Sequence, residues 1–227
     1  MYRHGSAPRK TAKTYQAPTT ADLGSIAGQV PAISANDVNG IPLNGTGLNG
    51  TAWADGTKIW SLAAFAEVRA SSAPTAEFEM SSFGFKSHQS DTSIAEFLGD
   101  KGQITSGDGT AEMGPSGLLI EGFIYIPPGE HTISVRSDDG FALSIGGVPF
   151  TMYDGYRGSE PTSARADFAG GLYEIEMLYF DGGGGMRLDL AIDGVPVDQS
   201  ALYATQADFE TRPQASRCRM RRPTIRR

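Results

Sequence analysis

The alternation of apolar and polar residues between residues 117 and 194 is the feature that most constrains the fold. Runs with an apolar side chain at every second position are separated by turn-forming groups of glycine, proline and aspartate. Successive side chains of a strand point to opposite faces, so each run predicts a strand with one buried face. The apolar positions are Leu118, Ile120, Ile124 and Ile126; Ile133 and Val135; Tyr173, Ile175, Met177 and Tyr179; and Met186, Leu188, Leu190 and Ile192.

No alternation of strands with helices accompanies these runs, which argues against a doubly wound fold. The spacing of the turns predicts an all-β protein, an antiparallel β-sandwich or barrel. One short helix is expected at Asp91–Gly99, where Ser93 and Glu96 have capping-box spacing and Gly99 is a stop signal. The segment from Lys58 to Arg69 fits either a helix or a strand.

Four segments are expected along the chain. Residues 1–22 form a basic disordered arm, and residues 23–75 form an Asn/Gly-rich segment that is partly structured. Residues 76–205 form the sandwich, and residues 206–227 form an Arg-rich tail. Within the second segment, three Asn-Gly pairs five residues apart predict loops or tight turns, because both residue types accept positive φ. They are Asn39-Gly40, Asn44-Gly45 and Asn49-Gly50.

The net charge of −7 conceals a strong asymmetry. Residues 23–210 carry 8 basic and 25 acidic side chains, a net charge of −17, while the two ends carry the other 11 basic residues. An acidic body of this kind is unsuited to binding nucleic acid and fits calcium or an extracellular setting. Nucleic-acid binding is therefore expected only through the Arg-rich tail, if at all. No window predicts a membrane span, and no N-terminal signal peptide is recognisable.

Two adjacent carboxylates, Asp138 and Asp139, interrupt the alternation between two predicted strands. In an extended chain their side chains point to opposite faces, so they can share one ligand only if the peptide between them is cis or sharply bent. A non-proline cis bond costs about 2.5–4 kcal/mol, which a bound ion can offset. The alternative interpretation is an ordinary Asp-Gly hairpin with an extra solvated acid.

A second loop, Asp181 to Gly185, also lies between two strands and begins with a carboxylate. Its glycines free the backbone carbonyls to turn toward a ligand. Calcium takes six to eight oxygen ligands from carboxylates, carbonyls and water, and two such loops at one end of a sandwich can supply them. The sequence therefore predicts a Ca²⁺ site.

Catalytic motifs find little support, and the chain is expected not to be an enzyme. The three histidines lie in an arm, a loop and a strand start, with no Gly-x-Ser-x-Gly elbow and no His-Glu-x-x-His helix. The glycine run is not followed by the Lys-Ser/Thr pair of a phosphate loop. Glycosidase carboxylates stand about 5–9.5 Å apart, farther than two aspartates bent onto one ion.

Several sequence motifs occur in a fixed order that is typical of one known family. Residues 119–141 contain Ile-Pro-Pro-Gly-Glu-His-Thr-Ile-Ser-Val-Arg-Ser-Asp-Asp-Gly, and residues 169–180 contain Ala-Gly-Gly-Leu-Tyr-Glu-Ile-Glu-Met. With Asp91-Thr92-Ser93-Ile94 and Phe97-Leu98-Gly99, this order resembles the PA-fourteen domain named after anthrax protective antigen, and most closely its versions in bacterial RTX adhesins. The resemblance covers residues 76–203 and implies a jelly-roll β-sandwich lectin.

The resemblance also implies a ligand set. Carried over, Asp138 and Asp139 are the primary calcium ligands, and Asp181 with the carbonyls of Gly182 and Gly184 supplies the rest. Many relatives have a bulky polar side chain in this loop, where the present chain has only glycine after Asp181. Sugar hydroxyls are expected to complete the coordination. Residues suited to flank the sugar are Tyr153, Asp154, Tyr156, Arg157 and Gly183.

The expected function is therefore a calcium-dependent carbohydrate-binding module that works in adhesion at the cell surface or outside the cell, with glycans as partners. The alternative is a non-catalytic structural or assembly protein, a component of a surface filament or particle. In that case the basic arms dock to partner subunits and produce a homo-oligomer or a larger assembly.

Overall fold

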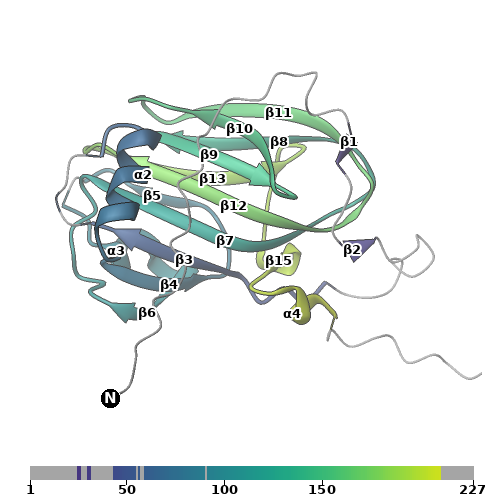
Figure 1. Cartoon of the computed structure of the whole chain (residues 1–227), viewed down its shortest axis with the longest axis horizontal. Helices are drawn as coiled ribbons and strands as arrows, with labels where there is room; N and C mark the ends of the chain where they lie inside the picture. Colours follow the sequence, from purple (N-terminus) through teal and green to yellow (C-terminus); the bar gives the residue numbers. More distant parts are fainter. Residues whose placement is uncertain are drawn as a thin grey trace, which may run out of the picture.

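The computed structural model describes residues 43–54, 56, 59–89 and 91–210, and the backbone of residues 25–26 and 30–31. The strands of this part form two sheets (Figure 1). The first sheet has the order β1 (Ser25–Ile26), β11 (Glu160–Phe168), β8 (Gly129–Asp138), β13 (Met186–Ile192) and β14 (Val195–Pro196), and β5 (Phe85–Ser87) also pairs with β13. All of these pairs are antiparallel except β1 with β11.

The second sheet is larger, and every strand pair in it is antiparallel. Its order is β10 (Val148–Tyr153), β9 (Gly140–Ile145), β12 (Gly171–Asp181), β7 (Ser116–Ile126), β3 (Leu48–Trp53), β4 (Ala76–Met80) and β6 (Gly102–Gly107). β15 (Leu202–Tyr203) pairs with β7, and β2 (Val30–Pro31) pairs with β12. The predicted all-β antiparallel sandwich is confirmed.

The core lies between the two sheets and follows the alternation read from the sequence. In β13, Met186, Leu188 and Leu190 are buried, while Arg187 and Asp189 between them are partly exposed on the outer face. In β7 and β12, most positions on both faces are buried. The outer face of the second sheet must therefore be covered by other parts of the chain.

Two helices provide this cover, one at each end (Figure 1). α2 (Leu62–Ser71) begins after Ser61, whose side-chain oxygen accepts a hydrogen bond from the Ala64 N–H at 3.1 Å. Its buried residues pack on strands β7, β9 and β12 in a cluster that contains Leu62, Phe65, Val68, Leu119, Ala142, Leu178 and Phe180. At the other end α4 (Gln206–Glu210) places Phe209 on the ring of Tyr125, with the ring centroids 6.1 Å apart.

The third helix, α3 (Ile94–Leu98), lies where the sequence predicts it. Ser93 and Glu96 form the expected capping box, and Ile94, Phe97 and Leu98 are buried. Two short 3₁₀ turns occupy Gly99–Lys101 and Gln199–Ala201. Two helices join the one that was expected, because the ambiguous segment after Lys58 folds as α2 and residues 206–210 fold as α4.

Strand β3 corrects two further expectations. It lies between β4 and β7 in the second sheet, so the predicted start of the sandwich at Ala76 is too late. The pair Asn49-Gly50 belongs to this strand instead of a turn, because Gly50 leaves room for the ring of Phe78 on the neighbouring strand. The Arg-rich tail expected from residue 206 begins with α4. The basic arm of residues 1–22, the pair Asn39-Gly40 and residues 211–227 lie outside the described residues.

None of the helices in the described part of the chain is long and apolar enough to cross a bilayer.

The close approach at Gly50 is testable by substitution. A Cβ atom at this position would lie 2.1 Å from the ring atoms of Phe78. Gly50→Ala is therefore expected to lower the free energy of unfolding by roughly 1–3 kcal/mol, as overpacked cores do. Urea denaturation measures the change. Gly158→Ala is the matched control, since a Cβ there meets nothing within 4 Å. Equal effects of the two variants would contradict the packing described for β3.

Candidate functional site

Both acidic loops join the two sheets at the same end of the sandwich. β8 of the first sheet ends at Asp138 and β9 of the second begins at Gly140, while β12 of the second ends at Asp181 and β13 of the first begins at Met186. Strand pairing fixes their relative position, because Asp138 is paired with Arg187, and Phe180 with Gly140. The Asp138–Asp139 peptide is cis, as the sequence predicts.

The three aspartates of these loops meet. One carboxylate oxygen from each of Asp138, Asp139 and Asp181 lies within 4.8 Å of the other two. Asp181 is fully buried, Asp139 is 5% exposed and Asp138 is partly exposed. The carboxylates therefore form one cluster that is closed on the protein side and open on the side of Asp138.

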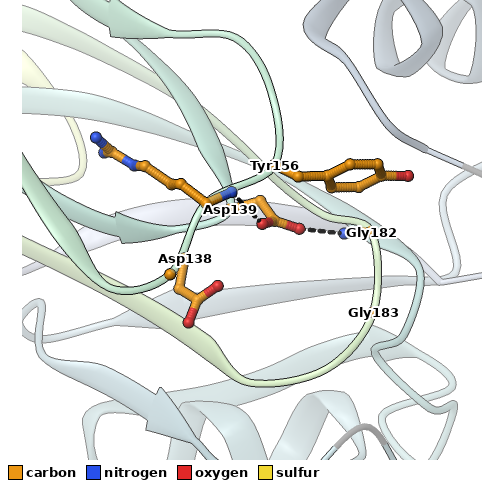
Figure 2. Close-up of a pocket in the computed structure, with 7 residues that line it drawn as sticks. Asp138, Asp139, Tyr156, Gly182 and Gly183 are labelled. Atoms are coloured by element: carbon orange, nitrogen blue, oxygen red, sulfur yellow. Dashed lines mark hydrogen bonds between the residues drawn. The ribbon is translucent and has the colours of Figure 1, made fainter.

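Backbone N–H groups hold two of the three carboxylates. Asp139 Oδ1 accepts a hydrogen bond from the Arg157 N–H at 2.8 Å, and its Oδ2 accepts one from the Gly182 N–H at 3.0 Å (Figure 2). Asp181 Oδ2 accepts a hydrogen bond from the Gly183 N–H at 2.8 Å. Asp181 Oδ1 is buried and has no hydrogen-bond partner among the described residues. A buried carboxylate oxygen without a partner is costly unless a cation meets it.

The carboxylates perturb one another's ionisation. Burial, and next the negative charge of Asp139, raise the pKa of Asp181 to about 7, although the Gly183 N–H acts in the opposite direction. Burial and then the charge of Asp139 also raise the pKa of Asp138, against the effect of Arg157. The cluster thus holds more negative charge than its surroundings compensate, which favours binding of a cation.

Two side chains that sequence reasoning did not single out hold the backbone of the aspartate pair. Ser137 Oγ donates a hydrogen bond to the Asp139 carbonyl at 2.5 Å, and the Tyr179 hydroxyl donates one to the Asp138 carbonyl. Burial raises the pKa of Tyr179, so this hydroxyl stays protonated. The available sequence signal was the position of Tyr179 at an inward-facing site just before the Asp181 loop.

A shallow cavity of about 520 Å³ opens over the cluster. Its wall includes Tyr156, which is 61% exposed and whose ring points away from Asp138 in Figure 2. A Cβ atom at Gly182 would lie 2.0 Å from this ring, so the glycine makes room for it. The cavity is lined by Asp138, Asp139, Tyr156, Arg157, Gly158, Gly182 and Gly183.

The residues expected to flank a sugar divide into two groups. Arg157 and Gly183 line the cavity, although the Arg157 guanidinium donates to Thr162 Oγ1 and Ser137 Oγ, both at 2.7 Å. Tyr153 and Asp154 are not among the lining residues. The Tyr153 hydroxyl donates to the Tyr156 carbonyl at 3.2 Å, and Asp154 Oδ1 accepts from the Leu62 N–H at 2.8 Å, at the start of α2.

The glycine loop presents N–H groups to the carboxylates. Gly182 and Gly183 donate to Asp139 and Asp181, and Gly184 is not among the residues that line the cavity. Coordination of an ion by the carbonyls of Gly182 and Gly184 therefore stays a prediction. To a cation, the three aspartates offer carboxylate oxygens as ligands. They lie in an open depression whose wall includes the exposed ring of Tyr156.

No family model matches the sequence, and no curated protein matches it. Solved structures do match the fold. The PA14 (PA-fourteen) domain of the MpAFP antifreeze protein has a TM-score of 0.60 at 22% identity, covering 70% of this chain and 90% of that chain. The PA14 sugar-binding domain from an RTX adhesin has a TM-score of 0.52 at 18% identity, covering 67% of this chain and 93% of that chain.

A fungal adhesin has a similar fold. The A domain of epithelial adhesin 6 from Candida glabrata, solved in complex with Galβ1-3GlcNAc, has a TM-score of 0.51 at 16% identity. The match covers 72% of this chain and 88% of that chain. The two sheets and these structural matches together show that the chain has a PA14-like β-sandwich fold.

Proposed function

We propose that this chain is a calcium-dependent carbohydrate-binding module that acts in adhesion at a cell surface or outside the cell. The observation that carries the proposal is the cluster of Asp138, Asp139 and Asp181, in which one carboxylate oxygen from each residue lies within 4.8 Å of the other two beneath an open cavity. The sugar-binding domain of the RTX adhesin and the glycan complex of epithelial adhesin 6 have the same type of fold and support the proposal.

Calcium fits the donor set better than a transition metal. The cluster contains carboxylates and no histidine or cysteine, and hard cations such as calcium prefer oxygen ligands. The unpartnered Asp181 Oδ1 supplies a buried oxygen that a cation would satisfy. Asp138, Asp139 and Asp181 would hold the ion, and the carbonyls of Gly182 and Gly184 are the proposed additional ligands.

The open cavity suits a sugar. A calcium ion held by the three aspartates would supply coordination to sugar hydroxyls. Tyr156 gives an exposed aromatic wall beside the aspartates, and an apolar sugar face can pack on such a ring. Asp139 is fixed by two backbone N–H groups, so the chain presents this ligand in one orientation.

The same geometry favours binding over hydrolysis. Carboxyl pairs of glycosidases stand about 5–9.5 Å apart, on either side of the sugar bond. One carboxylate oxygen from each aspartate of this cluster lies within 4.8 Å of the other two, a shorter separation than that of such a pair. The alternative assembly role depends on the two basic arms. These arms, residues 1–22 and the Arg-rich residues after 210, lie outside the described residues.

Calcium binding is the first test. Titration calorimetry of EDTA-treated protein is expected to show one calcium site, and calcium at 100 times its Kd should stabilise the fold by about 2.7 kcal/mol. Asp139→Asn should weaken calcium binding by about 10-fold or more, because a neutral amide oxygen replaces a charged carboxylate. Asp100→Asn, a change at an exposed carboxylate outside the cluster, is the control. An Asp139→Asn variant that binds calcium as tightly as the native protein would overturn the assigned site.

The raised pKa of Asp181 predicts a pH-dependent effect in the metal-free protein. The Asp181 carboxyl group has a pKa of about 7 in the folded protein and 3.8 in the unfolded chain. Its contribution to the stability of the fold is therefore fully present below pH 3.8 and is lost as the pH rises through 7. Asp181→Asn cannot ionise and avoids this loss. In EDTA, the variant should therefore be more stable than the native protein at pH 8, by on the order of 2 kcal/mol, with a smaller difference at pH 5.

Thermal unfolding across this pH range measures the difference. Adding calcium at pH 8 should make the native protein the more stable of the two, because the charged Asp181 carboxylate binds calcium more tightly than a neutral amide oxygen does. An Asp181→Asn variant that is less stable than the native protein at every pH, with and without calcium, would contradict the electrostatic account.

Sugar recognition is tested separately. Titration with galactose, glucose, mannose, fucose and lactose should show binding in calcium and none in EDTA. Tyr156→Ala should weaken the binding of any sugar by roughly 10-fold, the effect of about 1.4 kcal/mol of lost packing, and leave the calcium affinity unchanged. Val195→Ala, which also truncates an exposed apolar side chain, is the control. Sugar binding that persists in EDTA would refute calcium dependence.

A further inference from the structure

Basic residues are unevenly distributed over the acidic body. Residues 23–210 contain only 8 of them, and four lie close together near the outer face of the first sheet. Lys86 is paired with Arg187 between β5 and β13, and Arg136 is paired with Asp189 between β8 and β13. The fourth is Lys101, whose Cε atom lies 3.3 Å from where a Cβ atom at Gly84 would be.

Two of these residues, Arg136 and Arg187, line a cavity of about 460 Å³. Along one edge of β13 the hydrogen-bonding partner changes from the segment around Gly84 to the segment around Val197. The Gly84 N–H donates to the Leu188 carbonyl, and the Val197 N–H donates to the Leu190 carbonyl. Residues of β8 and β13 line the cavity together with apolar side chains from neighbouring segments. We call this cavity the basic groove; it is lined by Phe83, Gly84, Ser134, Arg136, Pro161, Arg187, Asp189, Leu190, Ala191, Gly194, Pro196 and Val197.

The two arginines keep donors to spare. Arg136 Nη1 donates to the Ser159 carbonyl at 2.9 Å, and Arg187 Nε donates to Asp189 Oδ2 at 2.7 Å. A guanidinium group carries five N–H donors, so each of these bonds uses only one of them. Asp189 is the only acidic residue that lines the basic groove. Two arginines and one aspartate leave it with a local positive charge on a body whose net charge is −17.

The basic groove begins beside the aspartate cluster. Arg136 and Asp138 stand two residues apart on β8 and so share its outer face, roughly 7 Å apart along the strand. Arg187 is paired with Asp138 across the two strands and lies on the same face. A chain of sugar units that starts on the cluster can therefore continue over the two arginines without leaving this surface.

We propose that the basic groove binds the carboxylate of an acidic sugar within a glycan whose neighbouring unit lies at Asp138, Asp139 and Asp181. The proposal rests on the proposed function and adds the class of glycan. Arginine matches a carboxylate with two parallel hydrogen bonds, and Lys86, the strand partner of Arg187, adds a further positive charge beside it. The rest of the acidic body repels an anionic glycan, so the basic groove supplies the attraction that lets such a glycan approach.

Matched ligands test this inference. An array of sialylated and uronate-containing oligosaccharides, each printed with its methyl ester, is probed with the native protein in calcium. At least one acid should bind better than its ester, and calorimetry on that pair should give a preference of about 10-fold in 50 mM NaCl, which falls in 500 mM NaCl because salt screens the charges. No preference for any acid over its ester would overturn the proposal.

Matched variants locate the effect. Arg187→Gln and Lys86→Gln should reduce the preference for the acid to below 3-fold, while the affinity for the ester and for calcium stays within 2-fold of native. Arg165 lies on β11 of the same sheet and forms a salt bridge with Glu130, so Arg165→Gln should keep the preference for the acid over its ester. A preference that survives in Arg187→Gln and Lys86→Gln would refute the assignment to the basic groove.

The two proposals fail in different ways. If binding of acids and esters alike persists in EDTA, the calcium-dependent function fails. If the preference for the acid is nevertheless lost in Arg187→Gln, the basic groove still binds the carboxylate. If calcium dependence holds and the acid is not preferred, only the inference about the basic groove fails.

Discussion

The confinement of three carboxylates to one small volume is the constraint on which the functional end of this molecule depends. Two of them are almost or wholly removed from water, and burial followed by the charge of Asp139 raises the pKa of Asp181 to about 7. Burying such charges costs free energy that the packing of the sandwich has to offset unless a cation is present. Stability without an ion and affinity for one therefore oppose each other at the same residues.

The sequence predicted the sandwich and the aspartate pair because both depend on local patterns. Alternation reports which face of a strand is buried, and a bent Asp138–Asp139 peptide follows from the need of two neighbouring side chains to face one ligand. The positions of Tyr156 and Asp154 could not be predicted in this way. Their orientations depend on contacts with Gly182 and with the start of α2, which lie 26 residues ahead and 92 residues back along the chain.

Residues 43–75 show the same limit. Asn49-Gly50 has the local signature of a turn, yet it lies within β3, where tertiary pairing with β4 and β7 overrides local propensity. The segment that became α2 fits two periods, and burial against Leu178 and Phe180 decides between them. The basic groove could not be predicted from the sequence either, because its charged residues come from strands that are adjacent only in the folded sheet.

The place of β3 in the second sheet has a consequence for how the domain can be divided. Because β3 lies between β7 and β4, a fragment that began at Ala76 would lose an interior strand instead of a terminal one. β7 and β4 would each be left with a row of backbone groups without partners, and α2 would be missing from the apolar surface it covers. Open strand edges beside exposed apolar surface recruit strands from other molecules. In the intact domain β3 pairs with both of these edges and α2 covers the apolar surface, so both elements close the sandwich in addition to extending it.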